Sequence, residues 1–227
     1  MLLLSIDASG KSAACAVTDG DKVICSEFIN SGLTHSQTLL PMIDKMLKEA
    51  NVDIKDIDAF AITNGPGSFT GLRIGMSLVM GLAGDKPCYP VPTLLALAHN
   101  ITDRDAVIIP AMDARRQQVY TAVFECKGGE IHRLEEDSAI AVSEVVAKFE
   151  NYKDKEIIII GDGAYLFEDV IKDYDNVSIG NIDNVYPLGA SIARAAQNIG
   201  SVKASELKLS YLRLSQAERE LKEKNSK

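Results

Sequence analysis

Two aspartates stand at positions where a carboxylate could do chemistry. Asp7 and Asp113 each end an apolar run that is typical of a buried strand. Carboxylates at two such strand ends, facing one cleft, could hold a metal-bound nucleotide, which is the chemistry of an ATP-dependent phosphotransferase. An aspartate that follows a strand is equally often a turn or helix-capping residue. Both interpretations stay open on the residues alone.

A glycine-rich segment follows the apolar run 59–62, and it reads Asn64-Gly65-Pro66-Gly67-Ser68-Phe69-Thr70-Gly71-Leu72-Arg73-Ile74-Gly75. The pattern predicts a strand, a tight turn and the start of a helix. Gly71, Gly75 and Gly81 inside that helix cost roughly 3 kcal/mol together relative to alanine. Such residues are kept where a helix or a ligand phosphate approaches the backbone closely. Neither the Walker pattern nor the dinucleotide pattern is complete, so we favour close packing.

The sequence gives little support for a metal-binding histidine pair or a nucleophilic serine. His35 has Leu39 four residues later, where a helical metal pair needs a second histidine. The sequence contains no G-x-S-x-G turn for a nucleophilic serine. We therefore expect no catalytic residue and no bound metal. Arg115 and Arg116 directly follow the second aspartate, and they form either a small anion or partner contact or a solvated turn.

Composition narrows the class of protein. The 227 residues carry a net charge of −8, whereas autonomous nucleic-acid binding usually needs a basic surface. Any RNA chemistry is therefore expected to run through a complex whose partner holds the RNA. The dispersed cysteines, with no C-x-x-C pair, indicate a reducing compartment. The apolar first residues lack a basic leader, so we expect a buried strand and a cytoplasmic protein.

The expected elements form a repeated unit. Strands are expected over 2–7, 13–18, 22–29, 58–63, 88–91, 106–113, 119–126, 131–134 and 156–160, and helices from about 38–50, 70–83, 93–100, 165–173 and 188–199. Placing Asp7 on Asp113 puts Val17 on Val123 without a gap. This order predicts an α/β protein with duplicated βββαβα lobes of the actin-like, RNase H-like class. We expect an N-terminal lobe over 1–103 and a C-terminal lobe over 104–227 that ends in a charged tail.

The glycine-rich segment from Asn64 to Arg73 resembles the signature of the TsaB (YeaZ) family, whose members take part in tRNA threonylcarbamoyladenosine biosynthesis. The segment 113–120 resembles a second family motif, and 161–164 and 211–213 add weaker matches. The resemblance covers nearly the whole chain. It implies the duplicated actin-like fold and a similarity to TsaD, which transfers threonylcarbamoyl from threonylcarbamoyl-AMP to N6 of the adenosine beside the tRNA anticodon.

The resemblance also implies a non-catalytic role. TsaD-like enzymes carry an H-x-x-x-H metal pair, and His35 with Leu39 departs from it. The implied partners are TsaD, TsaE (a P-loop ATPase) and, without TsaD, a second copy of the chain; tRNA binds only through the complex. No cofactor is expected on the isolated chain, although ATP or ADP can bind at the complex junction. The expected partner face is the first two helices: Leu39, Ile43, Met46, Gly71, Arg73, Ile74, Gly75 and Leu78. The alternative remains a phosphotransferase using Asp7 and Asp113, with Arg115 as an anion contact.

Overall fold

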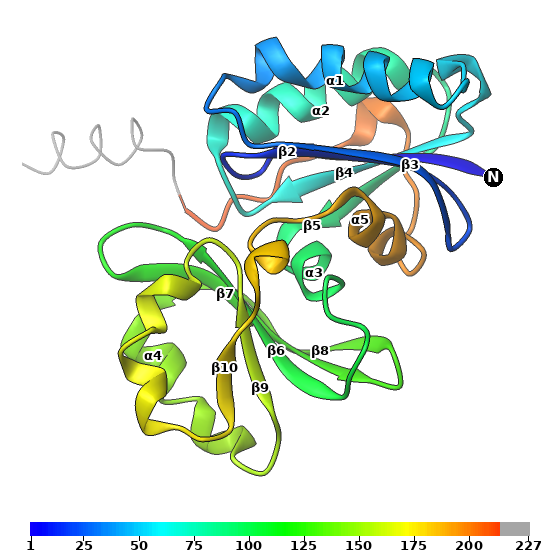
Figure 1. Ribbon diagram of the computed structural model, residues 1–227. Helices are drawn as coiled ribbons and strands as arrows, with labels where there is room; N and C mark the ends of the chain where they lie inside the picture. The colour runs from blue at the N-terminus through cyan, green and yellow to red at the C-terminus, as the bar shows by residue number, and fades with distance from the viewer. Residues whose placement is uncertain (214–227) are drawn as a thin grey trace, which may run out of the picture.

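The computed structural model describes residues 1–213, apart from the side chain of Ile182, and contains two five-stranded sheets (Figure 1). The first part of the chain forms β1 (Leu2–Asp7), β2 (Ala13–Asp19), β3 (Lys22–Ile29), α1 (His35–Glu49), β4 (Ala59–Gly65), α2 (Phe69–Ala83), β5 (Cys88–Pro92) and α3 (Thr93–Ala98). The second part forms β6 (Ala106–Asp113), β7 (Gln118–Lys127), β8 (Glu130–Ala141), α4 (Val142–Val146), β9 (Ile157–Ile160), β10 (Val177–Ile179) and α5 (Gly189–Ala196).

The two sheets share one topology, which confirms the predicted repeat. The first sheet runs β3-β2-β1-β4-β5, and the second runs β8-β7-β6-β9-β10 when read in the same sense. In each sheet the first three strands are antiparallel neighbours, and the last two are parallel to the first strand. Asp7 ends β1 and Asp113 ends β6, so the two acids occupy equivalent positions.

Helices cover both faces of the first sheet. The strands β1 and β4 alternate in side-chain direction, so Leu4, Ile6 and Phe60 pack under α1 and α2 while Leu3 and Ala61 face α5. The helices α3 and α5 lie between the two sheets (Figure 1), because α3 packs its leucines against β6 and α5 packs against β1. Both lobes are therefore joined through a helical layer and not through sheet pairing.

The last described segment returns to the first sheet. Ser5 Oγ donates to the carbonyl of Gly189 at 2.6 Å, and residues of α5 and of 202–209 join the first core. The division of the chain at 103/104 stays a prediction about domains. Each sheet lies on one side of it, but α5 and residues 202–209 pack against the first sheet. Among the described residues, no helix is both long and apolar enough to cross a membrane.

Several predicted boundaries are wrong. The first helix begins at His35, not near Thr38, because the amides of Gln37 and Thr38 bond to the carbonyl of Thr34 and thereby form an earlier turn. Pro41 lies inside that helix on its exposed side. The segment 165–173 forms two short 3₁₀ turns and not a helix. The strand β8 has twelve residues, from 130 to 141, and so extends beyond the short strand expected over 131–134.

Candidate functional site

The end of β1 forms a closed polar cluster around Asp7, whose side chain is 0 % exposed. Its Oδ1 accepts from the Thr63 hydroxyl at 2.6 Å and from the amide of Ser9 at 3.0 Å, whereas Oδ2 is buried without a partner. Burial raises the pKa of Asp7, and the two hydrogen bonds oppose that rise. The folded chain therefore holds the proton of this carboxyl group more tightly than the unfolded chain does, and the group is closed to solvent.

The N-terminal end of α2 closes this cluster. The amide of Ser68 donates to the carbonyl of Ser9 at 2.7 Å. A Cβ atom on Gly67 would lie 2.5 Å from that same oxygen, and one on Gly71 would lie 2.1 Å from the carbonyl oxygen of Ala8. The glycines of the signature segment thus allow the chain's own β1 loop to approach the helix. Gly71 also faces the ring of His35 at the start of α1.

His35 belongs to the same packed region. Its Nε2 lies 3.0 Å from the carbonyl oxygen of Gly10, and its ring packs against Gly71. Within residues 1–213, no three histidine, cysteine, aspartate or glutamate side chains gather as a metal site would require. The contacts of His35 are therefore those of a packing residue. The expectation of no bound metal stays a prediction.

Asp113 has a different environment from Asp7. It is exposed, its Oδ1 accepts from the amide of Arg115 at 2.7 Å, and its Oδ2 lies 3.4 Å from the Tyr165 hydroxyl. Beside it, Asp162 accepts from the amide of Asp113 at 3.0 Å, and burial raises the pKa of Asp162. The repeat makes the two strand ends equivalent in the backbone. In the tertiary structure, however, Asp7 is buried and Asp113 is exposed to solvent.

The predicted partner residues separate into two groups. Leu39 and Ile43 are each 1 % exposed and pack, with Met46, into the core under α1. Gly71 and Gly75 are buried as well, against the β1 loop and Ile62. The expectation that this apolar stripe and glycine notch are free for a partner is corrected: both are covered by the first lobe itself. The remaining predicted residues, Arg73, Ile74 and Leu78, are exposed or half-buried on α2.

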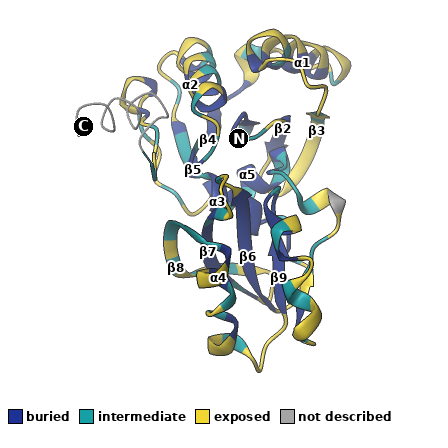
Figure 2. Ribbon diagram, turned by 90° about the vertical axis from the view of Figure 1, so that its left-hand side faces the viewer, coloured by how far each residue is buried: buried dark blue, intermediate teal, exposed yellow. Residues whose placement is uncertain are grey.

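The outer side of α1 and α2 is exposed (Figure 2), and some of the exposed residues there are apolar. Leu40 on α1 is 51 % exposed and Met80 on α2 is 39 % exposed, and Leu33 is exposed just before α1. Sequence reasoning missed that Leu40 is exposed. The consecutive leucines Leu39 and Leu40 could have indicated it, because two neighbouring residues on a helix cannot both face the same core. We call Leu33, Leu40, Ile74, Leu78 and Met80 the outer helix surface.

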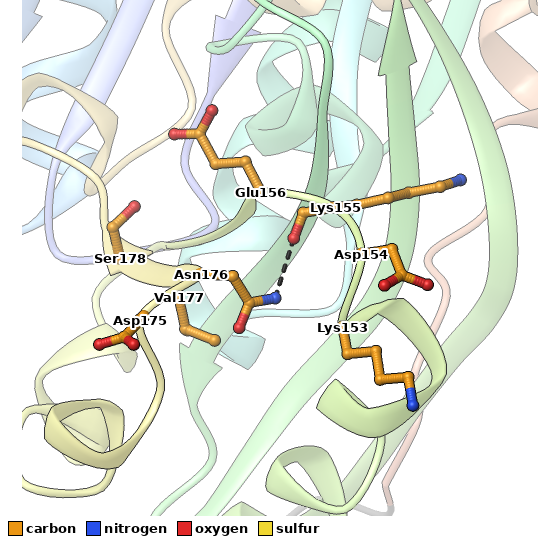
Figure 3. Close-up of a pocket in the computed structure, with 8 residues that line it drawn as sticks. All are labelled: Lys153, Asp154, Lys155, Glu156, Asp175, Asn176, Val177 and Ser178. Carbon is orange, nitrogen blue, oxygen red and sulfur yellow. Dashed lines mark hydrogen bonds between the residues drawn. The ribbon is translucent and has the colours of Figure 1, made fainter.

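A shallow hollow lies elsewhere, at the amino ends of β9 and β10 (Figure 3). It is lined by residues 153–156 and 175–178, and the amide of Asn176 donates to the carbonyl of Lys155 at 2.9 Å. In open sheets with parallel strands, ligands bind beyond the carboxyl ends of those strands. The hollow is at the opposite end from Asp113 and Asp162, so it is not part of the candidate site.

Comparisons with known proteins agree with this geometry. The family described as TsaD, tRNA N6-adenosine threonylcarbamoyltransferase, matches residues 27–221. The tRNA threonylcarbamoyladenosine biosynthesis protein TsaB of Bacillus subtilis is 29 % identical over 96 % of each chain, and the TsaB of Escherichia coli is 30 % identical over 76 % of each. The structure of YeaZ from Pseudomonas aeruginosa superposes with a TM-score of 0.75, at 24 % identity, over 93 % of this chain and 99 % of that one.

The repeated sheet order, with an acid at the end of the first strand of each repeat, defines a two-lobed α/β protein of the actin-like class. The YeaZ structure has this fold in common with the chain. The chain belongs to the TsaB family of tRNA threonylcarbamoyladenosine biosynthesis proteins, within the wider family that the TsaD match describes.

Proposed function

We propose that the chain is a non-catalytic subunit of the complex that places threonylcarbamoyl on tRNA. A TsaD-type partner transfers the group from threonylcarbamoyl-AMP to N6 of the adenosine beside the anticodon, in tRNAs that read codons beginning with A. A TsaE-type ATPase completes the complex. The chain supplies a folded surface that binds and activates the transferase, and tRNA binds productively only within the complex.

The closed environment of Asp7 is the observation that carries the non-catalytic role. A carboxylate that serves a metal-bound nucleotide must be charged and accessible, yet burial raises the pKa of Asp7 and no part of it is exposed. Its equivalent, Asp113, lies in solvent. No observation favours the alternative phosphotransferase that would use both acids. Tight one-to-one binding of ATP and magnesium by the isolated chain, measured by calorimetry, would contradict this conclusion.

The outer helix surface supports a partner at α1 and α2. Its residues are apolar and lie on α2, on α1 or just before α1, and the charged pair Asp44 and Lys48 follows Leu40 along α1. Gly81 on α2 is exposed, and an added Cβ atom there would meet nothing within 4 Å. A helix of the TsaD-type partner could therefore approach α2 closely at this point. The same surface would serve self-association when that partner is absent.

Charge substitutions on the outer helix surface test this proposal. The double variant Leu40→Asp with Ile74→Asp is expected to lose co-purification with the TsaD-type partner, because two charges would be buried without partners at the interface. Leu134→Asp is the matched control, since Leu134 is an exposed leucine on β8, in the other lobe. Circular dichroism must show that both proteins remain folded. Retention of the partner by the folded double variant would place the interface elsewhere.

A nucleotide at the complex junction is a separate part of the proposal. ATP or ADP would bind only when the partner is present, because the chain's own strand-end acid is closed. Equilibrium dialysis with ADP should therefore detect binding by the purified complex and none by the isolated chain. Equal binding by the isolated chain would contradict it.

A further inference from the structure

The segment 208–213, which we call the strap, crosses from the first lobe to the second (Figure 1). The amide of Ser210 donates to the carbonyl of Asn64 at 2.8 Å, and the Asn64 side chain donates to the carbonyl of Lys208 at 3.3 Å. A Cβ atom on Gly65 would lie only 2.1 Å from the Ser210 carbonyl oxygen. The signature glycine at this position therefore allows the strap to pass over the end of β4.

The strap places an aromatic side chain beside the start of α2. The ring of Tyr211 stacks on Phe69, with centroids 4.5 Å apart and an interplanar angle of 8°. Arg73 donates from Nε to the Tyr211 hydroxyl at 3.0 Å, and its guanidinium lies near both rings. Tyr211 is still 40 % exposed, so the stack holds Arg73 in place without covering the tyrosine.

Two residues further, the strap reaches the turn after β6. Arg213 donates to the carbonyl of Ala114 at 2.9 Å and lies over the ring of Tyr120, 5.5 Å from its centroid. In that turn Arg115, Arg116 and Gln117 have φ values of 64°, 55° and 57°, and all three are exposed. Residues other than glycine rarely adopt this left-handed backbone conformation. The turn thus presents two arginine side chains to solvent next to Arg213.

Together these residues bring four arginines to the junction of the lobes, where the exposed Asp113 lies beside Arg115. We call Arg73, Arg115, Arg116 and Arg213 the junction arginines; they are four of the eight arginines in the chain. Ion pairs within 4.0 Å involve other arginines, Arg104 and Arg133, and none that lies within residues 1–213 involves a junction arginine. The chain as a whole carries a net charge of −8, so half of its arginines gather at this junction against an acidic background.

We propose that the junction arginines bind the phosphodiester backbone of RNA. Guanidinium groups bind phosphate oxygens through two parallel hydrogen bonds, and arginine beside exposed aromatic rings is typical of surfaces that bind unpaired RNA. The choice of RNA over another polyanion rests on the proposed function, since the family acts in tRNA modification. The tRNA would then contact both lobes of this chain and not its partner alone.

Fluorescence anisotropy with a labelled, unmodified tRNA transcript tests this proposal on the full-length chain at 50 mM salt. We expect binding with a dissociation constant below about 100 μM, within the range of non-specific nucleic-acid binding. The double variant Arg115→Gln with Arg116→Gln should bind roughly tenfold or more weakly. The slope of log affinity against log salt should fall by about 1.4 to 1.8, because two phosphate contacts are lost.

The matched control is Arg104→Gln with Lys172→Gln, which removes the same charge from exposed residues that pair with carboxylates elsewhere. It should change the affinity less than twofold. Absence of RNA binding by the unaltered chain, or equal losses in both double variants, would overturn the proposal.

Co-purification with the TsaD-type partner separates this inference from the proposed function. The Arg115 and Arg116 double variant should retain the partner while losing RNA, whereas the Leu40 and Ile74 double variant should lose the partner and retain RNA. Loss of the partner by the arginine variant, with RNA binding unchanged, would show that the junction arginines contact a protein instead.

Discussion

Gly71 and Gly81 lie on the same helix and have opposite surroundings. A Cβ atom on Gly71 would meet the backbone oxygen of Ala8 at 2.1 Å, and one on Gly81 would meet nothing within 4 Å. We expect Gly71→Ala to lower the free energy of unfolding by about 1 to 3 kcal/mol, because the β1 loop must move. Gly81→Ala should raise it by about 0.5 to 1 kcal/mol. Urea unfolding of both variants measures this, and an unaffected Gly71→Ala would contradict the close approach.

Asp7 makes stability depend on pH. Its pKa is raised by burial in the folded chain above its value in the unfolded chain. The folded state therefore binds the proton more tightly than the unfolded state does. The stability that this proton binding contributes is complete below the unfolded pKa, about 3.9, and is lost as pH rises through the folded pKa. Asp7→Asn does not titrate, so its stability does not fall with this pH rise, and its amide oxygen can still accept hydrogen bonds from Thr63 and Ser9.

The expected result is that the melting temperature of Asp7→Asn, relative to the unaltered chain, rises from pH 4 to pH 7. Calorimetry at both values provides the measurement, and Asp113→Asn serves as the exposed control. A difference that is constant with pH, or that falls, would show that the pKa of Asp7 is not raised in the folded chain.

At the scale of the element, helix α1 has one face in the core and a neighbouring face in solvent. Ile43 is buried among β-strand residues, whereas Leu40 is exposed. Ile43→Ala should lower the free energy of unfolding by about 2 to 5 kcal/mol, because it leaves a cavity. Leu40→Ala should change it by less than about 0.5 kcal/mol. Chemical denaturation distinguishes them, and equal effects would contradict the orientation of the helix.

Ile43 and Leu40 also show what hydrophobic periodicity alone can predict about helix α1. The spacing of Leu39, Ile43 and Met46 correctly predicts a helix with one apolar face. It does not identify what that face packs against, because burial in the chain's own sheet and burial against a partner select the same residues. The contacts with Phe60 and Ile62 decide in favour of the sheet.

At the scale of the whole molecule, the strap links the two lobes through Gly65. Gly65→Ala should displace the strap, because its Cβ atom would lie 2.1 Å from the Ser210 carbonyl oxygen. Hydrogen exchange of the Ser210 amide, now bonded to Asn64, should become faster, while amides of β1 remain protected. Gly20→Ala is the control, since Gly20 also has a positive φ, of 57°, but no atom within 4 Å. Unchanged protection of Ser210 in Gly65→Ala would show that the strap accommodates the methyl group.

The sequence by itself determined the local order of elements and the repeat, because alternation, helical periodicity and the turn glycines are properties of near neighbours. It therefore predicted the first sheet, the second sheet without its last strand β10, and the strand-end positions of Asp7 and Asp113. Only the tertiary structure decided that the first acid is closed off, that the glycines approach the β1 loop, and that Arg73, Arg213 and the turn at Arg115 meet at one junction. These outcomes depend on contacts between segments that are, in some cases, more than a hundred residues apart. The spacing of residues along the sequence does not show which distant segment packs against which.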